Sequence, residues 1–294
     1  MKPGIPYLEL PELPLLPARA IGDFPAETLT LKPFGTLVAL GVYVGAWLAV
    51  REGRRRGYSE RELMAFITWV VAGGFIGGHV LDAIFYYPRD VLADPLSLLR
   101  LWEGLSSFGG FCGALLGGIG FRLRHRAGIL PYTEVLSSSF PAAWVFGRLG
   151  CTFAHDHPGV RSEAWFAVAY PDGGRLDLGL FELLITIPLA LYFLRCRARG
   201  PRPLGFYTGV MCTYYAPLRF MLDFLRAGED DSAGPFGGVG DARYSALTPA
   251  QWACFPLLGL GLYMLRRSRS GDAPRAAAPS SDAELDRGRG HTST

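Results

Sequence analysis

The most informative part of this sequence reads Gly147-Arg148-Leu149-Gly150-Cys151-Thr152-Phe153-Ala154-His155-Asp156-His157-Pro158-Gly159. It ends a long apolar segment that begins near Glu134. Arg148 lies inside that segment, about two helical turns before its polar end. Because a guanidinium is costly at membrane depth, it needs an anionic partner or a watery cavity. The stretch therefore predicts a functional arginine in a membrane helix, followed closely by four chemically versatile side chains, Cys151, His155, Asp156 and His157.

The composition of the chain is typical of a membrane protein. Half of its 294 residues are hydrophobic, and the mean hydropathy is +0.21. The net charge is only +3, and the arginines stand in short clusters between apolar runs, which argues against a nucleic-acid partner. The five cysteines are scattered without CxxC spacing, so we expect no disulfide framework and no metal.

Seven apolar segments follow one another along the chain. They cover about residues 34–50, 63–87, 104–121, 133–154, 178–194, 204–225 and 249–265. Arginine clusters follow the first, third, fifth and seventh segments. Since arginine-rich loops stay in the cytoplasm, this pattern predicts an all-α bundle of seven transmembrane helices, with the N-terminus outside and the C-terminus cytoplasmic.

Three further regions complete the predicted domain organisation. Residues 1–30 are proline-rich, and either an arm on the periplasmic membrane surface or disorder would suit them. Residues 31–269 form the seven-span domain, with a small periplasmic insert at about 156–177 that contains the turn signal Pro171-Asp172-Gly173-Gly174. Residues 270–294 have the composition of a disordered cytoplasmic tail.

Ionisable side chains of both signs fall within or at the ends of the apolar segments. They are Asp82, Arg148, Glu182, Arg219, Asp223 and Arg226. The last three are spaced i, i+4, i+7, and therefore share one helix face. A structural ion network is one interpretation. The other is a site for an anionic lipid head group that opens to the outer leaflet, because the guanidinium fork grips phosphate and keeps its proton.

The order and spacing of several motifs resemble the prolipoprotein diacylglyceryl transferases of bacterial inner membranes, from about residue 34 to 265. The most specific motif is Gly147-Arg148-Leu149-Gly150, and the next is the Arg219…Asp223…Arg226 pattern. Weaker matches are Ala93-Asp94-Pro95-Leu96, Trp102-Glu103-Gly104, Ser107-Phe108-Gly109-Gly110, Phe181-Glu182 and Pro201-Arg202-Pro203-Leu204-Gly205.

The resemblance implies that the chain transfers a diacylglyceryl group from phosphatidylglycerol to the lipobox cysteine thiol of prolipoproteins, and that glycerol phosphate leaves. By the same resemblance, the chain would need no cofactor and would work in the bilayer of the inner membrane. Arg148 and Arg219 would be catalytic, holding the lipid phosphate and the charge that grows on the leaving group. The resemblance also implies contacts to phosphatidylglycerol from Arg226, Glu182, Asp223, Ser107, Gly109, Gly110, Cys151 and His79.

Several positions depart from the family's pattern. No histidine follows Ser107-Phe108, Cys151 stands where an asparagine is usual, and the acid at 223 is an aspartate. His79 and Gly179 replace an arginine and a glutamine. These differences bear on catalysis more than on fold.

His155 and His157 are the predicted catalytic replacements for the absent histidine, with Asp156 or Asp82 as the orienting acid. Exposed loop histidines, a metal pair and a nucleophilic Cys151 are the alternatives. If no base replaces the histidine, the chain would be a catalytically inactive relative that binds lipid or assists assembly. A transporter of an anionic amphiphile is a third possibility, but no pair of broken helices supports it.

Overall fold

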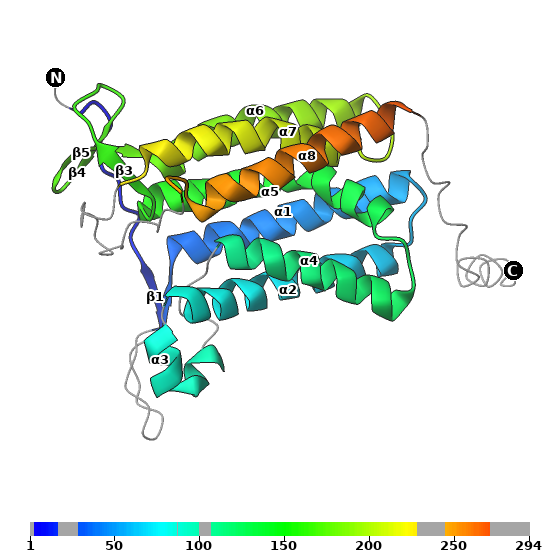
Figure 1. Ribbon diagram of the computed structural model, residues 1–294, viewed down its shortest axis with the longest axis horizontal. Coiled ribbons are helices and arrows are strands. Elements are labelled where there is room, and N and C mark those ends of the chain that lie inside the picture. Colours follow the sequence, from blue (N-terminus) through cyan, green and yellow to red (C-terminus); the bar gives the residue numbers. More distant parts are fainter. Residues whose placement is uncertain (1–2, 17–28, 87, 100–106, 228–244, 271–294) are drawn as a thin grey trace, which may run out of the picture. The chain divides into compact units, whose positions relative to one another are not determined.

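Helices dominate the computed structural model, which describes residues 3–16, 29–86, 88–99, 107–227 and 245–270. Among these residues, seven helices have 17 residues or more (Figure 1): α1 (Pro33–Arg55), α2 (Glu60–Tyr86), α4 (Ser107–His125), α5 (Leu130–Ala154), α6 (Leu178–Ala198), α7 (Phe206–Leu222) and α8 (Pro249–Arg269). Shorter elements are α3 (Pro88–Ala93), η1 (Pro95–Leu99) and η2 (Asp223–Leu225). The tail expected after Ser270 lies outside the described residues, as does part of the N-terminal arm.

Each predicted apolar segment coincides with one of the long helices. Several helices continue past the predicted segment into its arginine cluster, as α1 does to Arg55 and α8 to Arg269. Arginine is a good helix former, so the helix persists where the apolar run has already ended. Among the described residues, α1, Glu60–Ile84 of α2 and α6 are long and apolar enough to cross a membrane. The expected helical, membrane-type fold is confirmed, whereas seven crossings and their orientation stay predictions.

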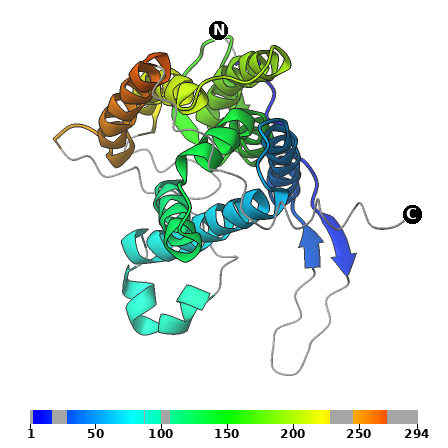
Figure 2. The same cartoon turned by 90° about the vertical axis from the view of Figure 1, so that its right-hand side faces the viewer.

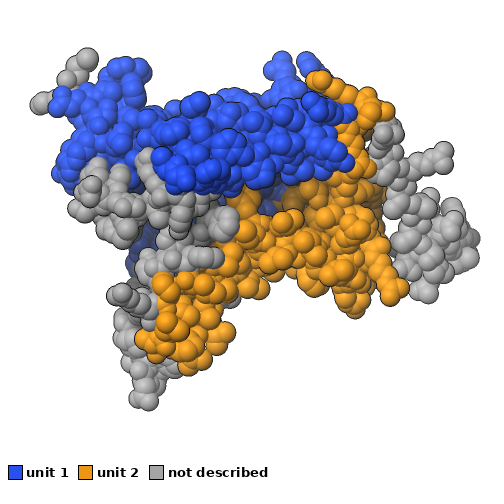
Figure 3. Space-filling model, viewed as in Figure 1, with its two compact units in different colours: residues 1–45, 137–200, 206–266 blue, residues 46–136, 201–205, 267–294 orange. Residues whose placement is uncertain are grey.

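The chain divides into two compact units, coloured separately in Figure 3. Unit 1 comprises Met1–Gly45, Ser137–Gly200 and Phe206–Arg266, and unit 2 comprises Ala46–Leu136, Pro201–Gly205 and Arg267–Thr294. In unit 2, α2 and α4 meet through glycines, small residues that let two helices approach closely. An aromatic cluster that includes Phe66, Phe121 and Tyr132 forms the core of that unit.

Three helices of unit 1, α6, α7 and α8, lie side by side (Figures 1 and 2). Leu189, Phe193 and Cys196 of α6 pack with Tyr207 of α7. Close approach of α7 and α8 depends on glycine, since a Cβ at Gly209 would lie 2.8 Å from Leu265. This packing aligns the segments that carry the ionisable side chains.

A small antiparallel sheet follows α5 and leads into α6 (Figure 1). Its strands are β3 (Pro158–Arg161), β4 (Val168–Tyr170) and β5 (Gly173–Asp177), in the order β3-β5-β4. The turn between β4 and β5 falls at the predicted Pro171-Asp172-Gly173-Gly174 signal, and Gly173 has φ +126°, a conformation that favours glycine. The predicted turn is confirmed, and the strands that it joins form a hairpin.

The described part of the N-terminal arm is ordered by backbone pairing. The Ile5 N–H donates to Ala167 (3.2 Å), and the Ala169 N–H donates to Ile5 (2.9 Å), so the arm adds to the edge of the sheet beside β4. Further along, β1 (Leu13–Leu16) pairs antiparallel with β2 (Leu29–Leu31). The sequence did not predict these contacts, because strand pairing is decided by a distant partner.

Candidate functional site

Two arginines from different helices of unit 1 meet on one carboxylate. Nη2 of Arg148, on α5, lies 2.6 Å from one carboxylate oxygen of Glu182, on α6. Nη1 of Arg219, on α7, lies 2.6 Å from the other oxygen of the same carboxylate. Glu182 is almost fully buried, at 1% exposed. The two guanidiniums therefore converge, as the sequence predicts, but in this structure they converge on an acid.

Two aromatic side chains contact this cluster of Glu182 and the two arginines. Each lies one helical turn before the arginine of its own helix. Tyr215 stands four residues before Arg219, and its hydroxyl donates to Glu182 (3.1 Å). Trp144 stands four residues before Arg148, and its ring lies 5.3 Å from the guanidinium carbon. Residues four apart share a helix face, so the backbone of α5 and α7 places each aromatic ring against its arginine.

A second carboxylate extends the network towards α8. Asp223 of η2 forms an ion pair with Arg219, whose Nη2 lies 2.8 Å from one carboxylate oxygen, and Nε of Arg226 lies 3.6 Å from the same oxygen. Its other oxygen accepts from the hydroxyl of Thr248. Thr248 in turn caps the start of α8 by accepting from the Gln251 N–H at 3.1 Å. The three side chains thus join α7 to α8, but the expectation of one shared helix face is wrong, because α7 ends at Leu222 and Arg226 is extended.

The network has donor capacity to spare. Its three arginines and two acids, joined by the contacts above, carry a surplus of one positive charge. The buried Nε of Arg148 has no hydrogen-bond partner among the described residues. A buried N–H without an acceptor is unfavourable by roughly 1–3 kcal/mol, so the site is suited to an additional anionic oxygen.

His155 lies in a different, fully paired environment. It is 3% exposed, its Nδ1 is 2.7 Å from Asp177, and its Nε2 is 3.2 Å from the carbonyl oxygen of Leu8. The ring of Tyr7 stacks on it with a centroid separation of 3.9 Å. Asp177 also accepts from the Tyr170 hydroxyl at 2.9 Å and caps α6 through the Leu180 N–H. Both ring nitrogens are therefore engaged in holding the arm, the sheet and α6 together.

Cys151, Asp156 and His157 form a third group at the end of α5. One ligand-type atom of each lies within 4.8 Å of the others. Thiol, carboxylate and imidazole are zinc ligands, but Nη1 of Arg148 lies 4.0 Å from the Cys151 sulfur. This positive charge disfavours a cation, so we assign no metal to the group.

The two loop side chains of this third group have shifted pKa values. Desolvation raises the pKa of Asp156 to about 6, against the opposing effect of Arg148. Desolvation also lowers the pKa of His157 to about 3, and the charges of Arg148, Arg226 and Arg219 act in the same direction. At neutral pH, Asp156 is therefore mostly ionised and His157 is neutral.

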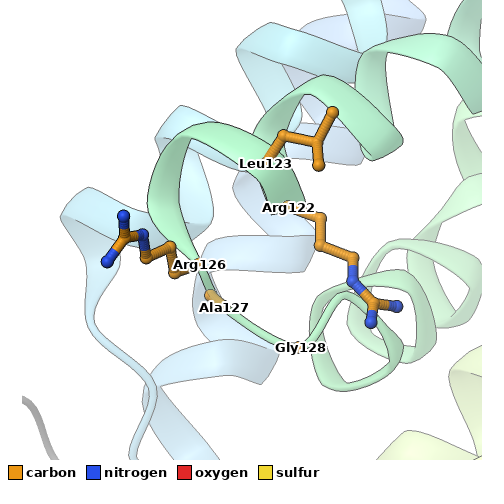
Figure 4. Close-up of a pocket in the computed structure, with 5 residues that line it drawn as sticks. All are labelled: Arg122, Leu123, Arg126, Ala127 and Gly128. Atoms are coloured by element: carbon orange, nitrogen blue, oxygen red, sulfur yellow. The ribbon is translucent and has the colours of Figure 1, made fainter.

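One open pocket of about 420 Å³ belongs to unit 2, in the turn after α4. Figure 4 shows its lining, in which the guanidiniums of Arg122 and Arg126 point in different directions. They do not converge on a common ligand position, so this pocket is not a candidate anion site.

Comparison with known proteins gives a consistent match. The family model described as prolipoprotein diacylglyceryl transferase matches residues 24–267. The chain belongs to the prolipoprotein diacylglyceryl transferase family. It is accordingly a transferase of lipoprotein biosynthesis with membrane-type helices.

Individual relatives in the family match over most of their length. Each is named phosphatidylglycerol–prolipoprotein diacylglyceryl transferase. The protein from Cereibacter sphaeroides is 28% identical over 285 residues, which cover 84% of this chain and 97% of the relative. The one from Nitratidesulfovibrio vulgaris is 27% identical over 251 residues, covering 82% and 91%. That from Polynucleobacter asymbioticus is 29% identical over 219 residues, covering 72% and 80%.

Unit 1 of this family member contains one part of the predicted site. Arg148, Glu182, Arg219, Asp223 and Arg226 form one network. The other predicted contacts, His79, Ser107, Gly109 and Gly110, belong to unit 2. There, His79 is buried and its Nε2 lies 3.2 Å from the Ser97 carbonyl oxygen, while Gly109 packs against α2.

Sequence reasoning missed the partners that orient the site. Tyr215 and Trp144 could have been found from their i, i−4 spacing to the two arginines. Asp177, Tyr7 and Tyr170 had no such signal, because they reach His155 only through the fold.

Proposed function

We propose that this chain transfers the diacylglyceryl group of phosphatidylglycerol to the lipobox cysteine thiol of prolipoproteins, with release of glycerol phosphate. The observation that carries the proposal is the meeting of Arg148 and Arg219 on Glu182, with a buried Arg148 N–H left without an acceptor among the described residues. The names of the relatives support the same reaction.

Glu182 prepares the arginines for a phosphate. Its two oxygens fix two guanidiniums that would otherwise repel each other, so little reorganisation is needed when the lipid arrives. The phosphate then uses donors that Glu182 leaves open, the Arg148 Nε among them. As the bond to the leaving oxygen breaks, the same donors stabilise the negative charge that develops on glycerol phosphate.

The proposed setting is the bacterial inner membrane. Seven crossings with the N-terminus outside would place the ends of α5 and α7 that carry these arginines near the periplasmic face. Phosphatidylglycerol would enter from the bilayer, and the signal peptide of a prolipoprotein would present its cysteine there. No cofactor and no nucleic acid take part.

The test is transfer from labelled phosphatidylglycerol to a lipobox peptide by the full chain in proteoliposomes. We expect Arg148→Ala and Arg219→Ala each to reduce the rate by on the order of 10²–10³, because each removes a donor to the developing charge. Arg148→Lys keeps the charge but loses the fork, and should recover only part of the rate.

Arg161→Ala is the matched control, since Arg161 is an exposed arginine at the end of β3, paired with Asp172. Its removal should leave the rate and the melting temperature nearly unchanged. The proposal fails if wild type transfers nothing, or if both site variants keep the wild-type rate.

The pairing of His155 favours one rival, a relative that binds lipid without transferring it. His155 has both ring nitrogens engaged. Wild-type protein that retains phosphatidylglycerol through Arg148 but transfers none to the peptide would establish this rival.

A further inference from the structure

The chain turns sharply where α5 ends. His155 adopts a left-handed conformation (φ +50°), which is uncommon outside glycine and reverses the chain after the helix. The turn is held by the bonds of His155 to Asp177 and Leu8. As a result, Asp156 and His157 return to the last turn of α5 and reach Cys151. His155 therefore positions its two neighbours and is not itself presented to a substrate.

Two groups flank the Cys151 thiol. A ligand-type oxygen of Asp156 lies within 4.8 Å of the sulfur, and the Arg148 Nη1 lies 4.0 Å from it. The carboxylate of Asp156 and the guanidinium of Arg148 thus both lie next to the Cys151 thiol. The Asp156 side chain is 33% exposed, so an incoming group can reach it.

The other acids and bases near Arg148 are less suited to accept a proton. His155 has no free ring nitrogen, and Glu182 is held by two guanidiniums. His157 binds protons too weakly, because desolvation and the arginines lower its pKa to about 3. Asp156, in contrast, can be reached by an incoming group, and it lies near Arg148 and beside the Cys151 thiol.

We infer that Asp156 is the general base that accepts the proton of the incoming lipobox thiol, in place of the histidine that the family usually carries on its third span. This inference rests on the proposed function. The aspartate takes the S–H proton, and the sulfur attacks the glyceryl carbon that bears the phosphate. A C–S bond forms, the C–O bond breaks, and the electron pair leaves on the glycerol phosphate oxygen beside Arg148. The Asp156 proton then passes to water or to the leaving group.

A carboxylate suits this task when its affinity for protons is raised. Desolvation raises the pKa of Asp156 to about 6, close to the neutral range in which a general base works best. The charged and titratable groups that act on Asp156 come from α5, from its own loop and from the sheet: Arg148, Cys151, His157, Asp177 and Tyr170. Among them, Arg148 opposes the rise and Asp177 supports it.

The test compares the pH dependence of kcat/KM for wild type, Asp156→Asn and Asp156→Glu in proteoliposomes. The kcat/KM of wild type should rise with pH and level off above about pH 6, because Asp156 is then ionised. Asp156→Asn should be slower at pH 7 by on the order of 10²–10⁴. Its kcat/KM should show no plateau and should keep rising with pH until the substrate thiol itself ionises, at about pH 8.5. Asp156→Glu should restore much of the plateau.

Arg161→Ala serves as the control and should keep the wild-type profile, while bound phosphatidylglycerol per molecule reports folding of every variant. His157→Gln tests the imidazole as a rival base. An Asp156→Asn protein with the wild-type rate and plateau would overturn this inference alone. If His157→Gln, and not Asp156→Asn, loses the plateau, the base is the imidazole and the inference is wrong. Absence of any transfer by wild type would remove the proposed function, and this inference with it.

Discussion

Asp177 shows how one side chain can organise a whole end of unit 1. Its carboxylate caps α6 through Leu180, accepts from Tyr170 and binds His155. His155 joins two acceptors, with Nδ1 2.7 Å from Asp177 and Nε2 3.2 Å from the Leu8 carbonyl oxygen. Such a buried network is stable only while every member is satisfied.

Replacement of His155 by alanine tests this structural role. We expect His155→Ala to destabilise the protein by about 1–3 kcal/mol, because Asp177 loses a buried partner. Thermal unfolding in detergent measures this loss. Transfer per folded molecule should fall less than in Asp156→Asn, because the turn that positions Asp156 is loosened while the carboxylate is kept. If transfer disappeared while the melting temperature stayed the same, His155 would have to act in catalysis after all.

At the scale of elements, helix contact in unit 2 depends on individual glycines. A Cβ at Gly113 of α4 would lie 2.1 Å from the carbonyl oxygen of Gly73 on α2, which is far inside contact distance. A Cβ at Gly118 would meet only the Phe66 ring, at 3.9 Å. The two positions lie on the same helix and differ in what faces them.

Replacing each of these glycines with alanine should affect the melting temperature differently. Gly113→Ala should lower the melting temperature, because pushing α2 and α4 apart costs about 1–3 kcal/mol. Gly118→Ala should leave it unchanged or raise it, since alanine favours a helix by up to about 1 kcal/mol over glycine. Thermal unfolding followed by size-exclusion chromatography measures both variants. Equal melting temperatures for the two would contradict the proposed role of close backbone contact.

For the whole molecule, the arginine clusters predict which loops remain in the cytoplasm. The clusters follow α1, α4, α6 and α8, which are the first, third, fifth and seventh predicted spans. Reporter fusions test the orientation. A fusion after Asp172 should give active alkaline phosphatase, and one after Gly200 should give a fluorescent cytoplasmic reporter. Both fusions reporting the same side would refute the predicted topology.

The sequence by itself determined the helices and the two arginines. Apolar runs of about twenty residues predict helices because lipid satisfies no backbone hydrogen bond, whatever the rest of the chain does. The i, i+4 spacing of Arg219 and Asp223 likewise predicts their ion pair. Both signals are local, and so they could be read without a structure.

Only the tertiary structure decided what these groups meet. It joined Arg148 and Arg219 through Glu182, and it engaged both nitrogens of His155 with residues 22 and 147 positions away. It also turned Asp156 back towards Cys151. Hydrogen bonds and charge pairs have short range, so their partners depend on how distant segments pack, which spacing along one helix does not encode.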